Sequence, residues 1–234
     1  MIEINWPTAD WARPSSCSFT PRTRSLFSSS PLRRGRRVFG SIVDQWVAQV
    51  TFENLPPHLW TQLSALIARL DGPAGTLRMW DASRFLPRGM AAGLNLNTAV
   101  GIGQPFSDNT YFTDGTGWLD VSAYGVVVAD QPAGSDSLLI GGLIANQSLS
   151  LAAGDLFEVG GYLYMVTADA ASDANGMARV MIRPRLRLPA LAGDSVKFAY
   201  PTSPFQLLDD EQGGVEVASP VFGSFGLSLV EIVP

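Results

Sequence analysis

The sequence of 234 residues contains one cysteine, one histidine and one lysine, and each scarcity excludes some chemistry. Cys17 has no partner for an intrachain disulfide or for a cysteine-based zinc site. A Ser-His-Asp or Cys-His site would have to use His58, which follows Pro57 where a helix is expected to begin. We therefore expect no enzyme activity, no metal and no cofactor. A hydrolase with paired carboxylates is the catalytic class that the composition leaves open.

Long apolar runs are also absent. No stretch approaches the ~20 residues that a membrane-spanning helix needs. Residues 1–7 lack the basic segment followed by an apolar one that marks a secretion signal. We expect no association with a membrane and assembly in a cytoplasm.

Charged residues make up only 16% of the chain, and their distribution is uneven. Residues 1–88 hold eleven Arg and six acidic residues, a balance of +5. Residues 89–178 hold nine acidic residues and neither Arg nor Lys, whereas residues 179–234 hold five basic and six acidic ones. This division is easier to explain if residues 89–178 belong to a separate module.

The remaining composition is rich in turn formers, with 23 Gly and 16 Pro, and 46% of the residues are hydrophobic. It predicts a mainly β protein with a real core. Residues 46–52 alternate between apolar and polar, as in a half-buried strand. Pro56 and Pro57 end that strand and suit a helix start. Leucines and an isoleucine within residues 59–70 form one helical stripe, so we expect a helix packed on a sheet.

The middle of the chain shows short strands bounded by turns. Gly160-Gly161 and Asn175-Gly176 are two-residue hairpin signals. A small antiparallel barrel or sandwich is expected, of the size of SH3 or oligonucleotide/oligosaccharide-binding folds, and periodicity does not choose between them. Residues 169–176 are predicted to form a turn rather than a calcium loop, because Ile182 occupies the place of the closing carboxylate. The predicted strands are 123–129, 137–144, 156–159, 162–166 and 177–182.

Three further strands are expected at 204–208, 215–217 and 222–233. No helical pattern lies near them, so they need another sheet to bury their apolar face. Pairing them with the N-terminal strands would close a β-sandwich from both ends of the chain. The predicted domains are residues 1–88 with 199–234, a β-sandwich with one packed α-helix, and residues 89–198, an inserted β module.

One cluster of arginines is the sharpest local charge feature. Its guanidinium groups suit carboxylates on a neighbouring subunit, or the loop is simply solvated. Contact with nucleic-acid phosphates is the other interpretation, which the overall charge of -5 and the lack of a recognised nucleic-acid-binding fold disfavour. The candidate subunit-interface residues are Arg33, Arg34, Arg36 and Arg37.

Aromatic residues on a glycine-rich stretch, residues 109–118, suggest a sugar-binding loop. The competing interpretation places Phe112 and Trp118 in the core of the inserted module. The candidate glycan contacts are Asn109, Tyr111, Phe112, Asp114 and Trp118.

Two ordered blocks of sequence carry a family resemblance. The first runs from Ser30-Pro31-Leu32 through Trp46 and the helix at 59–70 to Gly75-Thr76 and Trp80-Asp81. The second covers residues 153–166 and is followed by Asp169 and Arg183-Pro184. In this order the blocks resemble the distal tail protein family of long-tailed bacteriophages, over roughly half of the chain. Residues 104–136 have no counterpart and look like an insertion.

The resemblance implies a structural virion protein of the tail tip, made in the host cytoplasm. Its copies would form a ring, six by family analogy, that joins the tail tube to the hub and fibre proteins. The ring would leave a channel for DNA without binding nucleic acid stably. The alternative function is a receptor- or carbohydrate-binding module of the tail tip, with the loop at residues 109–118 as its site.

Overall fold

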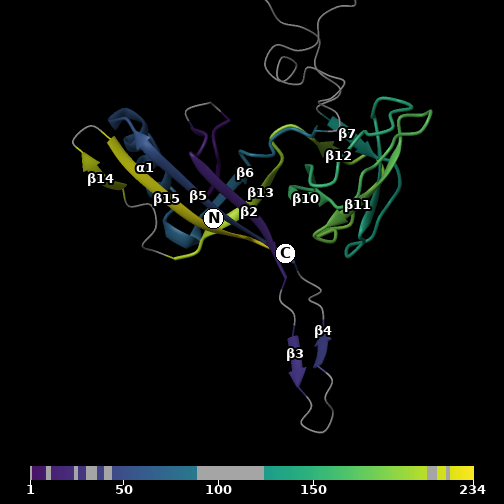
Figure 1. Ribbon diagram of the computed structural model, residues 1–234, viewed down its shortest axis with the longest axis horizontal. Coiled ribbons are helices and arrows are strands. Elements are labelled where there is room, and N and C mark those ends of the chain that lie inside the picture. Colours follow the sequence, from purple (N-terminus) through teal and green to yellow (C-terminus); the bar gives the residue numbers. More distant parts are fainter. Residues whose placement is uncertain are drawn as a thin grey trace, which may run out of the picture. The chain divides into compact units, whose positions relative to one another are not determined.

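The structure is a computed structural model, and it divides the chain into two compact units (Figure 1). One unit comprises Met1–Met79 and Pro204–Pro234, and the other comprises Trp80–Ser203. The described residues are 2–8, 12–23, 26–29, 36–39, 44–88, 124–209, 215–219 and 222–234.

The first unit, called the sheet unit below, is built around one mixed sheet of seven strands in the order β1-β6-β13-β15-β5-β2, with β14 also beside β15. Strand β1 runs parallel to β6, whereas β15 is antiparallel to β13, β14 and β5. The elements are β1 (Glu3–Asn5), β2 (Ser16–Arg22), β3 (Leu26–Ser29), β4 (Arg36–Phe39), β5 (Gln45–Leu55), α1 (Pro57–Ala68), the 3-10 turn η2 (Gly72–Ala74), β6 (Thr76–Trp80), β13 (Thr202–Leu207), β14 (Val215–Ser219) and β15 (Phe222–Glu231).

Strands from the two ends of the chain pair in this sheet, as predicted. Leu229, Leu227 and Phe225 of β15 lie opposite Ala48, Val50 and Phe52 of β5. All six side chains are buried, so the period-two alternation of both strands directs one apolar face into a common core.

The sheet curls over its own core. The ring of Phe19 in β2 lies 5.7 Å from that of Phe205 in β13, although β5 and β15 separate these strands in the sheet. Trp6, just after β1, packs at 5.6 Å on Phe52 of β5. Side chains from distant parts of one sheet therefore meet face to face, as the facing layers of a sandwich do.

Helix α1 begins at Pro57, two residues before the predicted stripe, and covers part of the sheet beside β15. Pro56 is extended and Pro57 starts the helix without needing a backbone N–H partner. Leu63 and Ile67 are the buried residues of its apolar stripe. Within the described ranges, no helix is long and apolar enough to cross a membrane.

The second unit, the barrel unit, contains a closed antiparallel barrel in the order β10-β11-β8-β7-β12-β9. Neighbours β12-β9-β10-β11 follow a Greek-key order, in which the last strand returns beside the first. Six closed strands distinguish this barrel from the five-stranded oligonucleotide/oligosaccharide-binding fold. Its strands are β7 (Tyr124–Val127), β8 (Ser137–Gly141), β9 (Leu156–Val159), β10 (Tyr162–Val166), β11 (Ala178–Arg183) and β12 (Ser195–Lys197).

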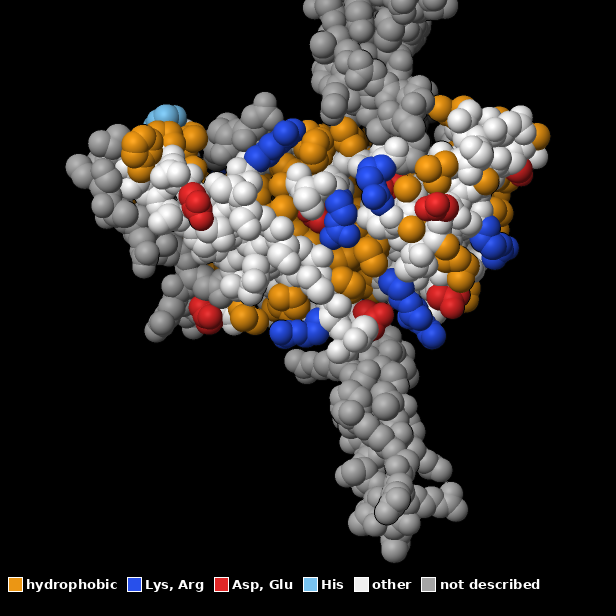
Figure 2. Space-filling model, viewed as in Figure 1, with side chains coloured by type: hydrophobic (Ala, Val, Ile, Leu, Met, Phe, Trp, Pro, Cys, Tyr) orange, Lys and Arg blue, Asp and Glu red, His pale blue; other side chains and the backbone are white. Residues whose placement is uncertain are grey.

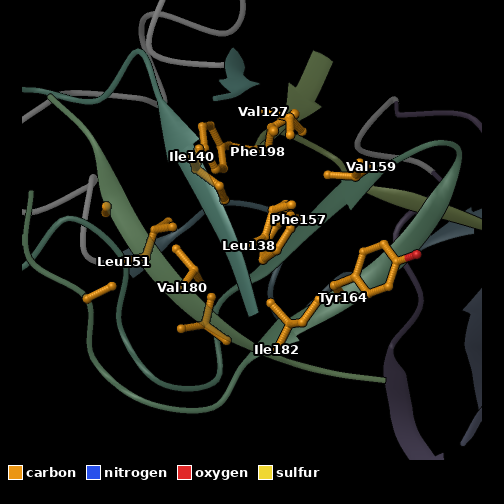
Figure 3. Packing of buried hydrophobic residues seen from close by; sticks show 14 of the residues in the cluster. Val127, Leu138, Ile140, Leu151, Phe157, Val159, Tyr164, Val180, Ile182 and Phe198 are labelled. Atoms are coloured by element: carbon orange, nitrogen blue, oxygen red, sulfur yellow. The ribbon is translucent and has the colours of Figure 1, made fainter. Parts of the chain in front are cut away.

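The barrel has its own hydrophobic core (Figure 3). The ring of Phe157 lies 5.9 Å from that of Tyr164 and 6.5 Å from that of Phe198. Leu138 and Val180, from β8 and β11, are also fully buried among these rings. In the described residues the architecture is therefore a mainly β fold with one α-helix and an inserted barrel, as the composition and turn pattern indicated.

The chain passes between the units at residues 79/80 and 203/204, whereas the predicted domain boundaries were 88/89 and 198/199. An aromatic cluster explains the difference. Phe85 stacks on Tyr200 at 5.2 Å, Trp80 meets Tyr200 edge-on at 5.0 Å, and Tyr200 N donates to the Phe85 carbonyl. These contacts hold both connecting segments within the barrel unit, so side-chain packing rather than charge determines the boundary.

A buried carboxylate also ties the segment before residue 89 to the barrel unit. Asp155 is 2% exposed, and its Oδ1 accepts bonds from Arg88 N and Nε, both at 3.1 Å. Its Oδ2 accepts a bond from Ala152 N at 2.8 Å. Arg88, the last basic residue of the Arg-rich region, is therefore a structural part of the barrel unit.

Replacing Asp155 with alanine should destabilise the barrel unit by about 1–3 kcal/mol, because two part-buried backbone donors lose their buried acceptor. The ion pair adds little, since the Arg88 side chain is 66% exposed. Urea unfolding followed by circular dichroism measures the loss. Asp169→Ala is the control, because exposed Asp169 accepts one comparable bond from Ala153 N, and its loss should stay below ~1 kcal/mol. Equal losses of unfolding free energy in the two variants would contradict a specific structural role for Asp155.

Candidate assembly and ligand surfaces

Most of the predicted site residues lie outside the described ranges. Arg36 and Arg37 belong to β4, whose backbone is described. Outside the described residues lie Arg33, Arg34, Asn109, Tyr111, Phe112, Asp114 and Trp118.

The arginine cluster falls on a hairpin that is separate from the large sheet. Strands β3 and β4 pair with each other and form a two-stranded sheet of their own. Their register places Ser29 opposite Arg36 and Ser28 opposite Arg37, with apolar pairs from Leu26 and Phe27 to Phe39 and Val38. This pairing establishes a hairpin where sequence reasoning expected only a polar, basic loop.

The hairpin is inserted between two neighbouring strands of the large sheet. Strands β2 and β5 pair up to Arg22 and Gln45, and the chain between these residues carries β3 and β4. A two-stranded hairpin alone is at best marginally stable in water. A further surface that covers it would therefore stabilise it.

Strand β2 forms one edge of the sheet, as far as the described residues extend. Within the described residues it pairs with β5. An edge strand is a position at which another strand can be added to a sheet. Pro21 has no backbone N–H to donate. Phe19 is buried, whereas Ser18, Thr20 and Arg22 are exposed. The exposed side chains of this edge strand are therefore polar.

A hollow of about 380 Å³ lies over the outward-facing side chains of β2 and of its neighbour β5. Apart from Val47 and Pro21 its lining is polar, and Arg22 is its charged group. Together, the hollow and strand β2 are called the edge surface of the sheet unit below. The hollow is lined by Ser18, Thr20, Pro21, Arg22, Val47 and Gln49.

The barrel unit has a second hollow of about 380 Å³, called the barrel pocket below. Glu158 is held in place there, since its Oε2 accepts bonds from Thr202 N at 2.8 Å and Thr202 Oγ1 at 2.9 Å. Lys197 Nζ lies 3.6 Å from the same oxygen. The pocket is lined by Tyr124, Glu158, Gly160, Gly161, Asp194, Ser195 and Lys197.

The turn at the rim of the barrel pocket is the one predicted from Gly160-Gly161. Val159 pairs with Tyr162, and both glycines have positive φ, +58° and +82°. Two positive φ values define a type I′ hairpin turn, which glycine adopts without strain. The glycines also leave this part of the rim without side chains.

The acidic stretch at residues 169–176 forms backbone turns. Asp173 Oδ1 accepts bonds from Asn175 N and Met177 N, both at 2.9 Å. Asp169 bonds to Ala153 N, as noted above. In the described part of the chain, no three His, Cys, Asp or Glu side chains are grouped so that they could hold a metal ion.

Sequence reasoning missed the barrel pocket because its residues are far apart in the chain. Tyr124 lies in β7 and Lys197 in β12, and the register of these strands makes them direct neighbours. One signal was present in the sequence: Lys197 is its only lysine.

No protein-family model matches the chain, and no curated protein matches it either.

Proposed function

We propose that the protein is a structural component of a bacteriophage tail tip. Copies of the chain form a ring, a hexamer by family analogy, that joins the tail tube to the hub and fibre proteins. DNA passes through its centre without stable binding, and the protein works in the virion after assembly in the host cytoplasm. Its role is mechanical, without catalysis.

The observation that carries this proposal is the separate β3–β4 hairpin. A ring needs two different, mutually complementary surfaces on each subunit. The hairpin, with Arg36 and Arg37 on β4, supplies the first. The edge surface along β2 supplies the second. Covering the hairpin with a neighbouring copy would give it the additional packing that a lone two-stranded sheet lacks.

Charge distribution supports contacts between unlike surfaces. Residues 1–88 carry a balance of +5, and residues 89–178 carry nine acidic groups and no basic ones. On the face in Figure 2, however, charged side chains are scattered among neutral ones rather than gathered in one large field. The charges therefore suit the selection of a partner at short range more than long-range attraction.

The mass of the full-length protein in solution tests the proposal. Native mass spectrometry of the chain, alone and with tail tube protein, should give masses that are whole multiples of the subunit mass, as a closed ring requires. Electron microscopy of the same sample should show rings with a central opening. A protein that stays monomeric at all concentrations, also with tube protein, would show the proposal to be wrong.

A charge-reversal variant locates the interface. Arg36→Glu with Arg37→Glu should weaken self-association at least about tenfold, because removal of favourable pairs at an interface costs over ~1.4 kcal/mol. Arg179→Glu with Arg183→Glu is the matched control, since these exposed arginines lie on β11 of the barrel. If both pairs have the same effect, the hairpin is not the specific contact.

A further inference from the structure

We propose that the barrel pocket binds one or two residues of an uncharged glycan. This inference concerns a different surface from the proposed ring contacts and does not depend on them. The pocket volume of about 380 Å³ falls within the range of small-molecule sites. Its lining combines one aromatic ring with several polar groups, which is the mixture that a sugar requires.

Tyr124 supplies the apolar wall. Its side chain belongs to β7 directly opposite Lys197 of β12, and the residue is 46% exposed. An exposed aromatic ring next to polar groups offers its face to the C–H side of a pyranose, while the phenol hydroxyl can still bond. Such a ring loses little conformational entropy on binding, since it has two side-chain torsions.

The polar groups match hydroxyls, which both donate and accept hydrogen bonds. Lys197 is a donor, and Glu158 and Asp194 are acceptors. Asp194 Oδ2 already accepts a bond from Leu191 N at 2.8 Å, which leaves Oδ1 for a ligand. Ser195 adds a hydroxyl that can do either. A sugar can therefore satisfy groups of both kinds at the same time.

Charge excludes the obvious competing ligands. Two carboxylates and one ammonium line the pocket, so the net charge of its lining is negative. Phosphate, nucleic acid and acidic polysaccharides would be repelled. An uncharged sugar meets no such repulsion.

Much of the pocket is already in its binding geometry. Thr202 holds Glu158 through two hydrogen bonds, and the Gly160-Gly161 turn is part of a regular hairpin. A ligand would therefore order few groups on binding, which reduces the entropic cost. The site differs from the loop at residues 109–118, because its lining comes from the barrel strands and the β9–β10 turn.

The single lysine makes a direct test possible. Reductive methylation with ¹³C-formaldehyde labels Lys197 and the terminal amine of the full-length protein, and the methylated lysine keeps its charge. The probes are methyl β-D-glucopyranoside, methyl β-D-galactopyranoside and N,N′-diacetylchitobiose, with inorganic phosphate and a heparin disaccharide as anionic probes. At least one neutral sugar should shift the Lys197 signal saturably, with a dissociation constant of about 0.1–10 mM, as expected for so small a ligand. The anionic probes should bind at least about tenfold more weakly.

Three variants test whether the sugar binds in the barrel pocket itself. Tyr124→Ala should weaken sugar binding at least about tenfold. Val126→Ala, on the same strand and equally exposed at 46% but outside the lining, should bind like the parent protein. Trp118→Ala should also bind normally. The proposal is wrong if no neutral sugar, among these or on a microarray of neutral bacterial-surface glycans, binds in a Tyr124-dependent manner, or if Trp118→Ala alone abolishes binding. Ring formation would be unaffected by either result.

Discussion

Replacing Trp46 with alanine is expected to lower the unfolding free energy of the sheet unit by about 3–5 kcal/mol, as for other fully buried aromatic residues. The Trp46 side chain is 0% exposed and lies in β5, the strand that pairs with both β2 and β15. Its loss leaves a cavity in the core of the sheet unit, near the end of β5 that pairs with Pro21 of β2 and bonds to Glu231 of β15.

The surroundings of Trp46 make the loss more costly. Its backbone N–H donates to Glu231 Oε2 at 3.1 Å, and Glu231 is itself 0% exposed. Gln45 Nε2 donates to the Glu231 carbonyl. A shift of β5 into the cavity would therefore disturb polar groups that are buried away from water.

Hydrogen exchange resolved by peptide measures this effect, because a chain with two units need not unfold in one step. Peptides of β5 and β15 should lose protection in Trp46→Ala, while peptides of β10 and β11 in the barrel keep it. Trp46→Phe is the control and should lose less, since it keeps a buried ring. A loss below ~1 kcal/mol in Trp46→Ala would contradict the assignment of this side chain to the core.

The second large effect is expected for Gly176→Ala in the barrel unit. Gly176 has φ +70°, and an added Cβ would lie 2.2 Å from the Leu143 carbonyl oxygen. That contact is with backbone, which is held in place because Leu143 N donates to the Gly176 carbonyl at 3.0 Å. Left-handed backbone costs alanine about 1–2 kcal/mol. Displacing the neighbouring chain adds about 1–3 kcal/mol, as overpacking does elsewhere.

Gly134→Ala separates these two contributions. Gly134 has φ +84°, but an added Cβ would meet nothing within 4 Å. This variant should therefore show the backbone strain alone. Chemical denaturation monitored on the barrel unit should give a loss at least about 1 kcal/mol larger for Gly176→Ala. Equal losses would mean that the loop at Leu143 moves aside freely.

Local signals predicted several elements closely. The hairpin of β9 and β10 has the predicted bounds, because Gly160-Gly161 determines both the turn and the register of the two flanking strands. Helix α1 was predicted from its apolar stripe and from Pro56 and Pro57, and it ends at Ala68, two residues before the end of the predicted stripe. In each case the information lies within a few consecutive residues.

Other elements have no sequence periodicity from which they could be predicted. Strand β12 has three residues, too few to show a period, although it closes the barrel between β7 and β9. Strand β2 is mostly polar and contains Pro21, as edge strands often do, so it resembles a loop. One end of the β3–β4 hairpin pairs serines with arginines, so its sequence lacks the apolar alternation that predicts a strand.

The amino-acid sequence by itself determined the mainly β class, the single helix, the turn at Gly160-Gly161 and the need of the C-terminal strands for another sheet. Periodicity and turn chemistry are local properties, so a linear reading suffices for them. The tertiary structure alone decided the curl of the sheet, the closure of the barrel, the boundary at Trp80 and the grouping of Tyr124 with Lys197. These depend on pairing and packing between residues far apart in the chain, which no local pattern encodes.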